Sequence, residues 1–329
     1  SLDTGETFLI EFRYKCKDGS WKWIFGRGKC VERDTKGKPT RMVGVHTDHT
    51  ERKKIELQIK ETLYESQIQQ KEISALLKAS QSIPLNESFD QMARSIFDIC
   101  CDLIGATSGY IALLSDDGAE NEVLFLEAGG LPCTVDPELP MPIRGLREVA
   151  YKSKNCAYDN DFANSKWMKY MPEGHVKLEN VLFAPLNIKN KTVGLIGIAN
   201  KPGGFTDRDA KVAKSFGDIA AVALTYAKNQ EQLKESEEKY RMLFTNMRNG
   251  FALHKVITDE NGKPENYIVT ELNPAYEELT GITKKMVLNK KIKDVIPNIE
   301  EEWIEKSGEV ALTGISSRIE QYVGKLDKY

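Results

Sequence analysis

The sequence predicts an α+β protein with more than one domain, and three observations carry this prediction. Helical and strand patterns alternate along the 329 residues. Several short runs keep the period-two alternation of antiparallel strands, and two long stretches of helix-forming residues contain neither Pro nor Gly. At about 150 residues per domain, the length itself favours two or three domains.

The first segment, residues 8–47, has the pattern of a three-stranded antiparallel meander. Phe8, Ile10 and Phe12 alternate with other residues at period two. Turn sequences follow at residues 17–20 and 34–38. Each turn separates two strand-like runs, so neighbouring strands are expected to pair.

A long helix is expected from Asp48 to Ser80. Asp48 and Glu51 have the spacing of an N-cap residue and its reciprocal capping partner. The helix carries a seam with alternating spacings of four and three, which favours a coiled-coil pairing over a helix docked on its own domain. The residues of this first seam are Ile59, Leu63, Ser66, Gln70, Ile73 and Leu77.

The central region predicts an antiparallel sheet with helices on one side. Apolar periodicity predicts helices at 89–104, 146–152 and from Asp207, and strands at 109–114, 122–127, 181–188 and 192–199. This order of elements is typical of an α+β domain.

The helix that begins near Asp207 is expected to continue past the end of this domain, because no Pro or Gly occurs between Asp218 and Met247. It carries a second seam, formed by Val212, Phe216, Ile219, Ala223, Tyr226, Gln230, Leu233, Glu237, Tyr240, Phe244 and Met247. After it we expect strands at 250–257 and 267–272, a helix from Asn273 to Gly281 and a further helix from Lys284. A last strand is expected at 317–323.

Composition excludes several classes of function. Lys plus Arg number 46 and Asp plus Glu number 49, a net charge of −3, which does not suit a nucleic-acid partner. No apolar run reaches the roughly 18 to 20 residues that cross a bilayer. Six cysteines without framework spacing favour a reducing, cytoplasmic location. Because the sequence starts at Ser1 and stops within a predicted strand, we expect a fragment of a longer protein.

Motifs of catalysis are absent from the sequence, including phosphate-binding loops, zinc-protease helices, the nucleophile elbow, the histidine-kinase box and the cyclase signature. We therefore expect no enzyme within this chain. His46, Asp48 and His49 lie close in sequence, but residues three apart in a strand point to opposite faces. We predict no metal site there.

Both ends of the chain resemble PAS sensor domains. Residues 238–244 and the run Asn-Pro-Ala-Tyr-Glu-Glu-Leu-Thr-Gly at 273–281 resemble the first half of such a domain. Residues 17–20, Trp23, the strand through Gly44 and residues 48–53 are similar to its closing strands and exit motif. The halves stand in reversed order, so they belong to two partial PAS domains.

The middle of the chain resembles a GAF domain. The match rests on residues 182–186, 193–200 and 204–205, and on Asp209 ahead of an Ala-rich helix. The predicted organisation is a PAS C-terminal part at 1–50, a signalling helix at 51–80, GAF at 81–228, a helical linker at 229–239 and a PAS N-terminal part at 240–329.

A polar and aromatic stretch falls where the GAF resemblance implies a helix and loop that cover a pocket. Its candidate ligand-binding residues are Tyr158, Asp161, Phe162, Trp167, Met171 and His175. A plain aromatic core is the alternative. His175 with Cys156 or Cys133 would suit haem or a tetrapyrrole, although no attachment motif supports either cofactor.

Two further groups resemble family signatures. Asn200, Lys201, Phe205 and Asp209 are similar to the signature of cyclic-nucleotide-binding GAF domains, but the match is incomplete because Ala210 replaces its final Glu. The alternative is a structural lock between a strand end and the closing helix. Asp48 and Thr50 lie where the PAS resemblance places the exit from sheet to helix, and we expect them to set the angle of that helix.

Two functions follow from these observations. The first is the sensory input and relay module of a signal-transduction protein, most simply a two-component histidine kinase whose output domain lies downstream in the same chain. A nucleotide cyclase or a regulator is the alternative output. In this hypothesis the GAF domain senses a small ligand and the module is a homodimer. The second is a dimerisation scaffold that binds no ligand.

Overall fold

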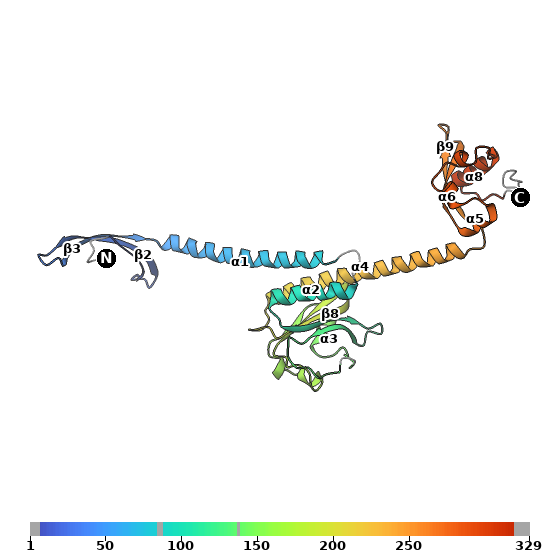
Figure 1. The fold of residues 1–329 in the computed structure, drawn as a ribbon. Helices are drawn as coiled ribbons and strands as arrows, with labels where there is room; N and C mark the ends of the chain where they lie inside the picture. Colours follow the sequence, from blue (N-terminus) through green and yellow to red (C-terminus); the bar gives the residue numbers. More distant parts are fainter. Residues whose placement is uncertain (1–6, 84–87, 137–138, 319–329) are drawn as a thin grey trace. The chain divides into compact units, whose positions relative to one another are not determined.

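The structure is a computed structural model that describes residues 7–83, 88–136 and 139–318. The chain divides into two compact units, residues 1–227 and 228–329. Figure 1 shows the elements along the chain. Among the described residues, no helix is both long and apolar enough to cross a bilayer.

The predicted meander is present at the start of the first unit. Strands β1 (Phe8–Lys15), β2 (Trp21–Arg33) and β3 (Pro39–Asp48) form an antiparallel sheet in that order. Gly19 and Gly37 adopt the left-handed conformation that closes the two hairpins. Large apolar side chains of this sheet remain open to solvent, with Leu9 and Val45 each 63% exposed. The sheet therefore covers no core of its own on that surface.

Helix α1 (Thr50–Gln81) follows β3 and corrects the predicted capping box. Asp48 is the last residue of β3, and the N-cap residue is His49, which makes no side-chain cap. Glu51 binds Lys54 one turn further along. The strand pairing of Asp48 with Ile24 holds it in the sheet, so the helix begins after it.

The first seam on α1 is mostly exposed. Ile59, Leu63, Ile73 and Leu77 are each more than half exposed. Near the C-terminal end of the helix, Ala79 is fully buried against α2 (Phe89–Ile104). The C-terminal end of α1 therefore packs against the neighbouring domain. Its first seam is not covered by any described residue.

The central region forms the predicted antiparallel sheet, and the α+β prediction is confirmed. Its five strands lie in the order β5-β4-β8-β7-β6. Their bounds are β4 (Ser108–Leu114), β5 (Asn121–Glu127), β6 (Ala157–Asp159), β7 (Val181–Ile188) and β8 (Lys191–Ala199). The short edge strand β6 was not predicted from the sequence.

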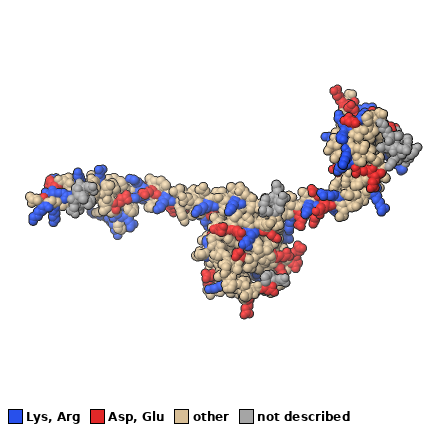
Figure 2. Space-filling model, viewed as in Figure 1, with Lys and Arg blue, Asp and Glu red and all other residues tan. Residues whose placement is uncertain are grey.

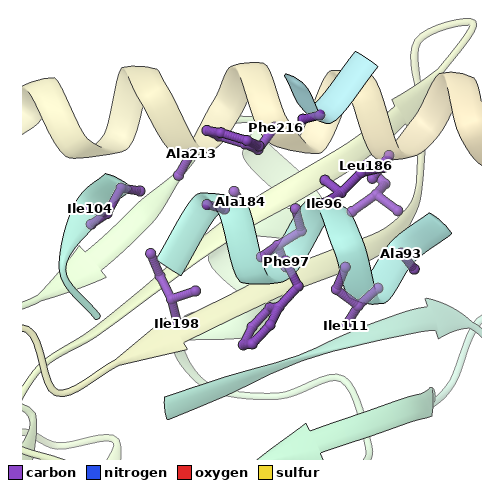
Figure 3. Packing of buried hydrophobic residues seen from close by; sticks show 14 of the residues in the cluster. Ala93, Ile96, Phe97, Ile104, Ile111, Ala184, Leu186, Ile198, Ala213 and Phe216 are labelled. Carbon is purple, nitrogen blue, oxygen red and sulfur yellow. The ribbon is translucent and has the colours of Figure 1, made fainter. Parts of the chain in front are cut away.

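Helices α2 and α4 (Asp207–Asn246) cover one face of this sheet. Ser88 and Gln91 form a capping box at the start of α2, and Gly105 ends it in the left-handed conformation. Phe97, Phe216 and Ile196 are among the largest fully buried side chains. Figure 3 shows side chains of both helices meeting those of the strands in this core.

The opposite face is covered as well, which corrects the prediction of helices on one side only. Helix α3 (Leu146–Ser153) packs Leu146 and Ala150 against Val181 and Phe183 of β7. Residues in β7 are buried in an unbroken run from Val181 to Leu186. Burial on both faces gives β7 a continuous apolar run in place of the alternation of a strand with one solvent-facing side.

The described part of the second unit contains strands β9 (Ala252–Thr258) and β10 (Pro264–Leu272), followed by four helices. The helices are α5 (Pro274–Thr280), α6 (Lys284–Val287), α7 (Ile292–Val295) and α8 (Glu301–Thr313). The fully buried Asn273 caps α5 by accepting from the N–H of Tyr276. Helix was expected from Lys284 onward, and the structure divides it into α6, α7 and α8. The strand expected at 317–323 lies mostly outside the described residues.

Both signs of charge are spread over the visible surface. Figure 2 shows Lys and Arg side chains alongside Asp and Glu in each part of the chain. This mixture agrees with the nearly equal numbers of basic and acidic residues, 46 and 49, in the sequence.

Candidate functional site

A cavity of about 380 Å³ lies on the face of the five-stranded sheet that carries α3. Its floor includes Ser108 and Tyr110 of β4, Phe183 of β7 and Gly197 of β8. These residues share one face because Tyr110 and Phe183 both pair with Gly197 in the strand register. The volume lies within the range of about 300–1,000 Å³ that small-molecule sites occupy.

Gly197 leaves room for the aromatic rings of the floor. A Cβ atom at this position would lie 2.7 Å from a ring carbon of Tyr110 and 3.1 Å from one of Phe183. A larger residue would displace both rings, so glycine is needed for their close approach.

Four of the six predicted ligand-binding residues line the cavity: Phe162, Trp167, Met171 and His175. Phe162 begins the 3₁₀ helix η1 (Phe162–Asn164), and Trp167 directly precedes η2 (Met168–Tyr170). Phe162 is 4% exposed. The wall is therefore apolar and aromatic, as the residue types predicted.

Tyr158 and Asp161 lie outside the cavity, which corrects their assignment. Tyr158 pairs with Leu182 in the register, and Leu182 belongs to the core on the α2 and α4 side. The Tyr158 hydroxyl donates to Asp207 at 2.8 Å. Asp161 accepts a hydrogen bond from Asn164 at 2.7 Å, and so stabilises the turn at η1.

The proposed pairing of His175 with Cys156 is also wrong. Cys156 packs against the α2 and α4 core, and its thiol donates to the carbonyl of Ala210 at 3.2 Å. Burial raises the pKa of Cys156 to about 11, so the thiolate form that binds metals is disfavoured. His175 and Cys133 both line the cavity, and Nδ1 of His175 lies 2.8 Å from the carbonyl oxygen of Val176.

Three further polar residues of the cavity were not predicted from the sequence: Ser108, Tyr110 and Arg147. Ser108 and Tyr110 belong to β4, and Arg147 lies in the first turn of α3. Burial raises the pKa of Tyr110, while the nearby Arg147 guanidinium opposes that shift. The period-two spacing of Ser108 and Tyr110 was a usable signal, but only the strand register reveals which face they occupy.

Asn200, Lys201, Phe205 and Asp209 do not line the cavity. Nζ of Lys201 lies 2.5 Å from a carboxylate oxygen of Asp209, and Phe205 is 3% exposed in the core under α4. Burial works against the ionised form of Asp209, but hydrogen bonds from Lys201 and Thr206 outweigh it and lower the pKa. This geometry joins the end of β8 to the start of α4.

The side chain of Asn200 completes this junction. Its carbonyl oxygen accepts from the N–H of Glu179, and its amide donates to the carbonyl of Lys177. Asn200 adopts a left-handed conformation with φ of 58°. The four residues thus act in the structure as contacts between the strand end and its neighbours.

Asp48 and Thr50 connect β3 to α1. One carboxylate oxygen of Asp48 accepts from the N–H of Thr50 at 2.9 Å, and the other lies 2.8 Å from Nζ of Lys22. Hydrogen bonds from Lys22 and Thr50 hold the pKa of Asp48 well below its usual range. The Thr50 hydroxyl accepts from the N–H of Trp23 on β2. Both side chains therefore link the start of the helix to the sheet.

Three family models match the chain. A PAS fold model matches residues 1–46, a GAF domain model matches residues 86–225, and a PAS domain model matches residues 238–314. No curated protein matches the sequence.

Solved structures with similar folds include several GAF domains. The GAF domain of a phosphoenolpyruvate-protein phosphotransferase from Acinetobacter is 13% identical, covers 48% of this chain and 94% of its own, and has a TM-score of 0.41. The GAF domain of a putative sensor histidine kinase from Pseudomonas syringae pv. tomato is 15% identical, covers 53% and 99%, and has a TM-score of 0.36.

A sensory box histidine kinase/response regulator from Burkholderia thailandensis E264 also matches part of the chain. It is 32% identical over 20% of this chain and 50% of its own, with a TM-score of 0.19. The three family models together identify the chain as a multi-domain PAS and GAF protein, in which one region that matches a GAF model lies between two regions that match PAS models.

Proposed function

We propose that this chain is the sensory input and relay module of a signal-transduction protein, with the GAF cavity as its ligand site. The observation that supports this proposal most is the cavity itself, which is built on a complete five-stranded sheet and walled by Phe162, Trp167 and Met171. Enclosure favours binding because apolar surface of the ligand leaves water.

The helices support a relay role. Phe216 of α4 is fully buried in the core beneath the sheet, and α4 continues to Asn246, beyond the region matched by the GAF model. A ligand that shifts the sheet would therefore act on a helix that also continues into the next segment. We further propose a cytoplasmic protein whose output is a histidine kinase domain in the same chain, with no catalysis by the residues described above.

Replacing Trp167 with Ala is expected to weaken ligand binding at least tenfold, which equals about 1.4 kcal/mol. The indole supplies apolar area to the wall of the cavity, so its loss leaves part of a bound molecule in water. His175→Ala is expected to change the ranking of ligands more than the fold. A thermal-shift screen of nucleotides, haem, bilins and small metabolites on the full chain measures both effects.

The matched control is Trp21→Ala, because Trp21 is 54% exposed on β2 and lies outside the cavity. It should leave ligand binding unchanged. A screen in which no compound changes the melting temperature would contradict the sensor proposal.

The second candidate is a dimerisation scaffold, which the exposed first seam on α1 favours. Apolar residues at the ends of the seam, such as Leu63 and Leu77, are more than half exposed. A parallel two-stranded coiled coil would bury them, with Gln70 as a polar layer. A homodimer is compatible with the sensor role too, so ligand binding distinguishes the two proposals.

Analytical ultracentrifugation at micromolar concentration should detect a dimer of the full chain. Leu63→Asp should shift it towards the monomer, because the substitution places a charge in the seam. Leu57→Asp is the control, since Leu57 is 59% exposed on the same helix but outside the seam. A strictly monomeric wild-type chain, or equal effects of both substitutions, would refute pairing through α1.

A further inference from the structure

The lining of the cavity includes a buried hydroxyl group without a hydrogen-bond partner in the part of the chain that the structure describes. Ser108 is 2% exposed, and its hydroxyl oxygen has no partner among the residues that the structure describes. The hydroxyl of Tyr110, two residues along the same strand, is buried as well and lies close to the guanidinium of Arg147. Leaving a buried polar group unpaired is destabilising, so a ligand that accepts hydrogen bonds here is favoured.

Arg147 places a positive charge in the lining of the same cavity, which also includes the acidic residues Glu127 and Asp136. Arg147 is half-buried. Glu127, which also lines the cavity, lies 2.9 Å from the guanidinium of Arg94 on α2 and is paired there. The positive charge of Arg147 is therefore not neutralised by the acidic side chain of Glu127.

The first turn of α3 adds further donors. Its N-cap residue is Gly145, which has a φ of 69° and no side chain to cap the helix. Arg144, Gly145, Leu146 and Arg147 all line the cavity. Uncapped N–H groups at the start of a helix attract anions. The partial positive charge at the N-terminal end of the helix dipole adds to the positive charge of Arg147.

We propose that the ligand of this cavity is a small organic anion, whose acidic group binds between Arg147 and the first turn of α3. The hydroxyls of Ser108 and Tyr110 donate to its oxygens, and its apolar part packs against Trp167 and Phe183. This inference rests on the proposed sensor function and adds the chemical class of the ligand. Carboxylates and phosphate esters share the required chemistry.

Two pairs of probes test the proposal on the full chain. The pairs are phenylacetate with phenylacetamide, and cyclic AMP with adenosine, so each anion is compared with a neutral molecule of similar shape. Calorimetric titration should show at least tenfold tighter binding of the anion in one pair. The pair that shows it distinguishes a carboxylate ligand from a phosphate ester.

Arg147→Gln should abolish the preference for the anion, and Arg147→Lys should retain part of it, since the charge remains but the bidentate geometry is lost. Lys152→Gln is the matched control, because it removes one positive charge from the same helix at an exposed site outside the cavity. Melting temperatures without ligand show whether each variant is folded, and the Lys variant provides the test if the Gln variant is not.

Equal binding of anion and neutral molecule, or an unchanged preference in Arg147→Gln, would overturn the anion proposal. Binding of the neutral members alone, lost in Trp167→Ala, would overturn it while leaving the sensor proposal standing. Absence of binding by all four probes would also overturn it, and the broader metabolite screen would then decide the sensor proposal separately.

Discussion

Replacing Phe216 with Ala should lower the stability of the GAF domain by about 3–5 kcal/mol. Phe216 is fully buried on α4, where it packs with side chains of α2 and of the sheet (Figure 3). Its removal leaves a cavity between elements that are themselves fixed by backbone hydrogen bonds. The core cannot close around the gap, so the lost contacts are not replaced.

Hydrogen exchange of the full chain is a suitable measurement because it reports on β7 and α2 separately from the second unit. Protection in these elements should fall in Phe216→Ala. Val222→Ala on the same helix is the control, since Val222 is 61% exposed and its truncation should change stability by less than about 0.5 kcal/mol. Equal protection in both variants would show that α4 is not part of this core.

Lys201→Met should destabilise the junction between β8 and α4 by about 2 kcal/mol. The side chains of Lys201 and Asp209 are 19% and 13% exposed, so this ion pair is far less solvated than the surface pairs of the chain. Without Lys201 the carboxylate keeps its bonds to Thr206 but loses its counter-charge. A partly buried charge without a partner is destabilising.

The matched control is Lys152→Met, which removes an ion pair to Glu148 whose side chains are 77% and 41% exposed. It should cost no more than about 0.5 kcal/mol. Urea unfolding of each variant, followed by fluorescence of Trp167 in a chain that lacks the other tryptophans, measures both. Similar losses for Lys201→Met and Lys152→Met would contradict a structural role for the buried pair.

Acid unfolding provides an independent readout of Asp209. Its pKa is lowered on folding, so the unfolded chain takes up the proton first as the pH falls. The stabilisation is therefore complete above the unfolded value of 3.8 and is lost as the pH falls below it. Lys201→Met should reduce this loss, because part of the lowering comes from Lys201.

Local signals in the sequence determined most of the secondary structure. The helix at 89–104 and the strand at 181–188 have the predicted bounds. Helix α4 is as long as the absence of Pro and Gly indicated. These features depend on propensity, capping and periodicity within a few residues, and such terms can be read from neighbouring positions.

Motifs in the sequence also predicted the GAF and PAS regions and the aromatic residues of the cavity wall. Phe162, Trp167, Met171 and His175 line one cavity, and the sequence grouped them because they belong to a single run of bulky residues between two elements. Helix was expected from Lys284 onward, but its division into α6, α7 and α8 was not predicted, since α7 and α8 pack on β10 through a few apolar residues that show no extended periodicity.

Which face each residue occupies was decided by the tertiary structure alone. Tyr158 was assigned to the cavity, yet its pairing with Leu182 turns it towards α2 and α4, while Ser108 and Tyr110 face the cavity through their pairing with β8. A shift of one residue in register reverses the direction of every side chain in a strand. Register depends on partners far apart in the sequence. The polar groups of the cavity can therefore be assigned to it only once the five strands are paired and α3 covers their second face.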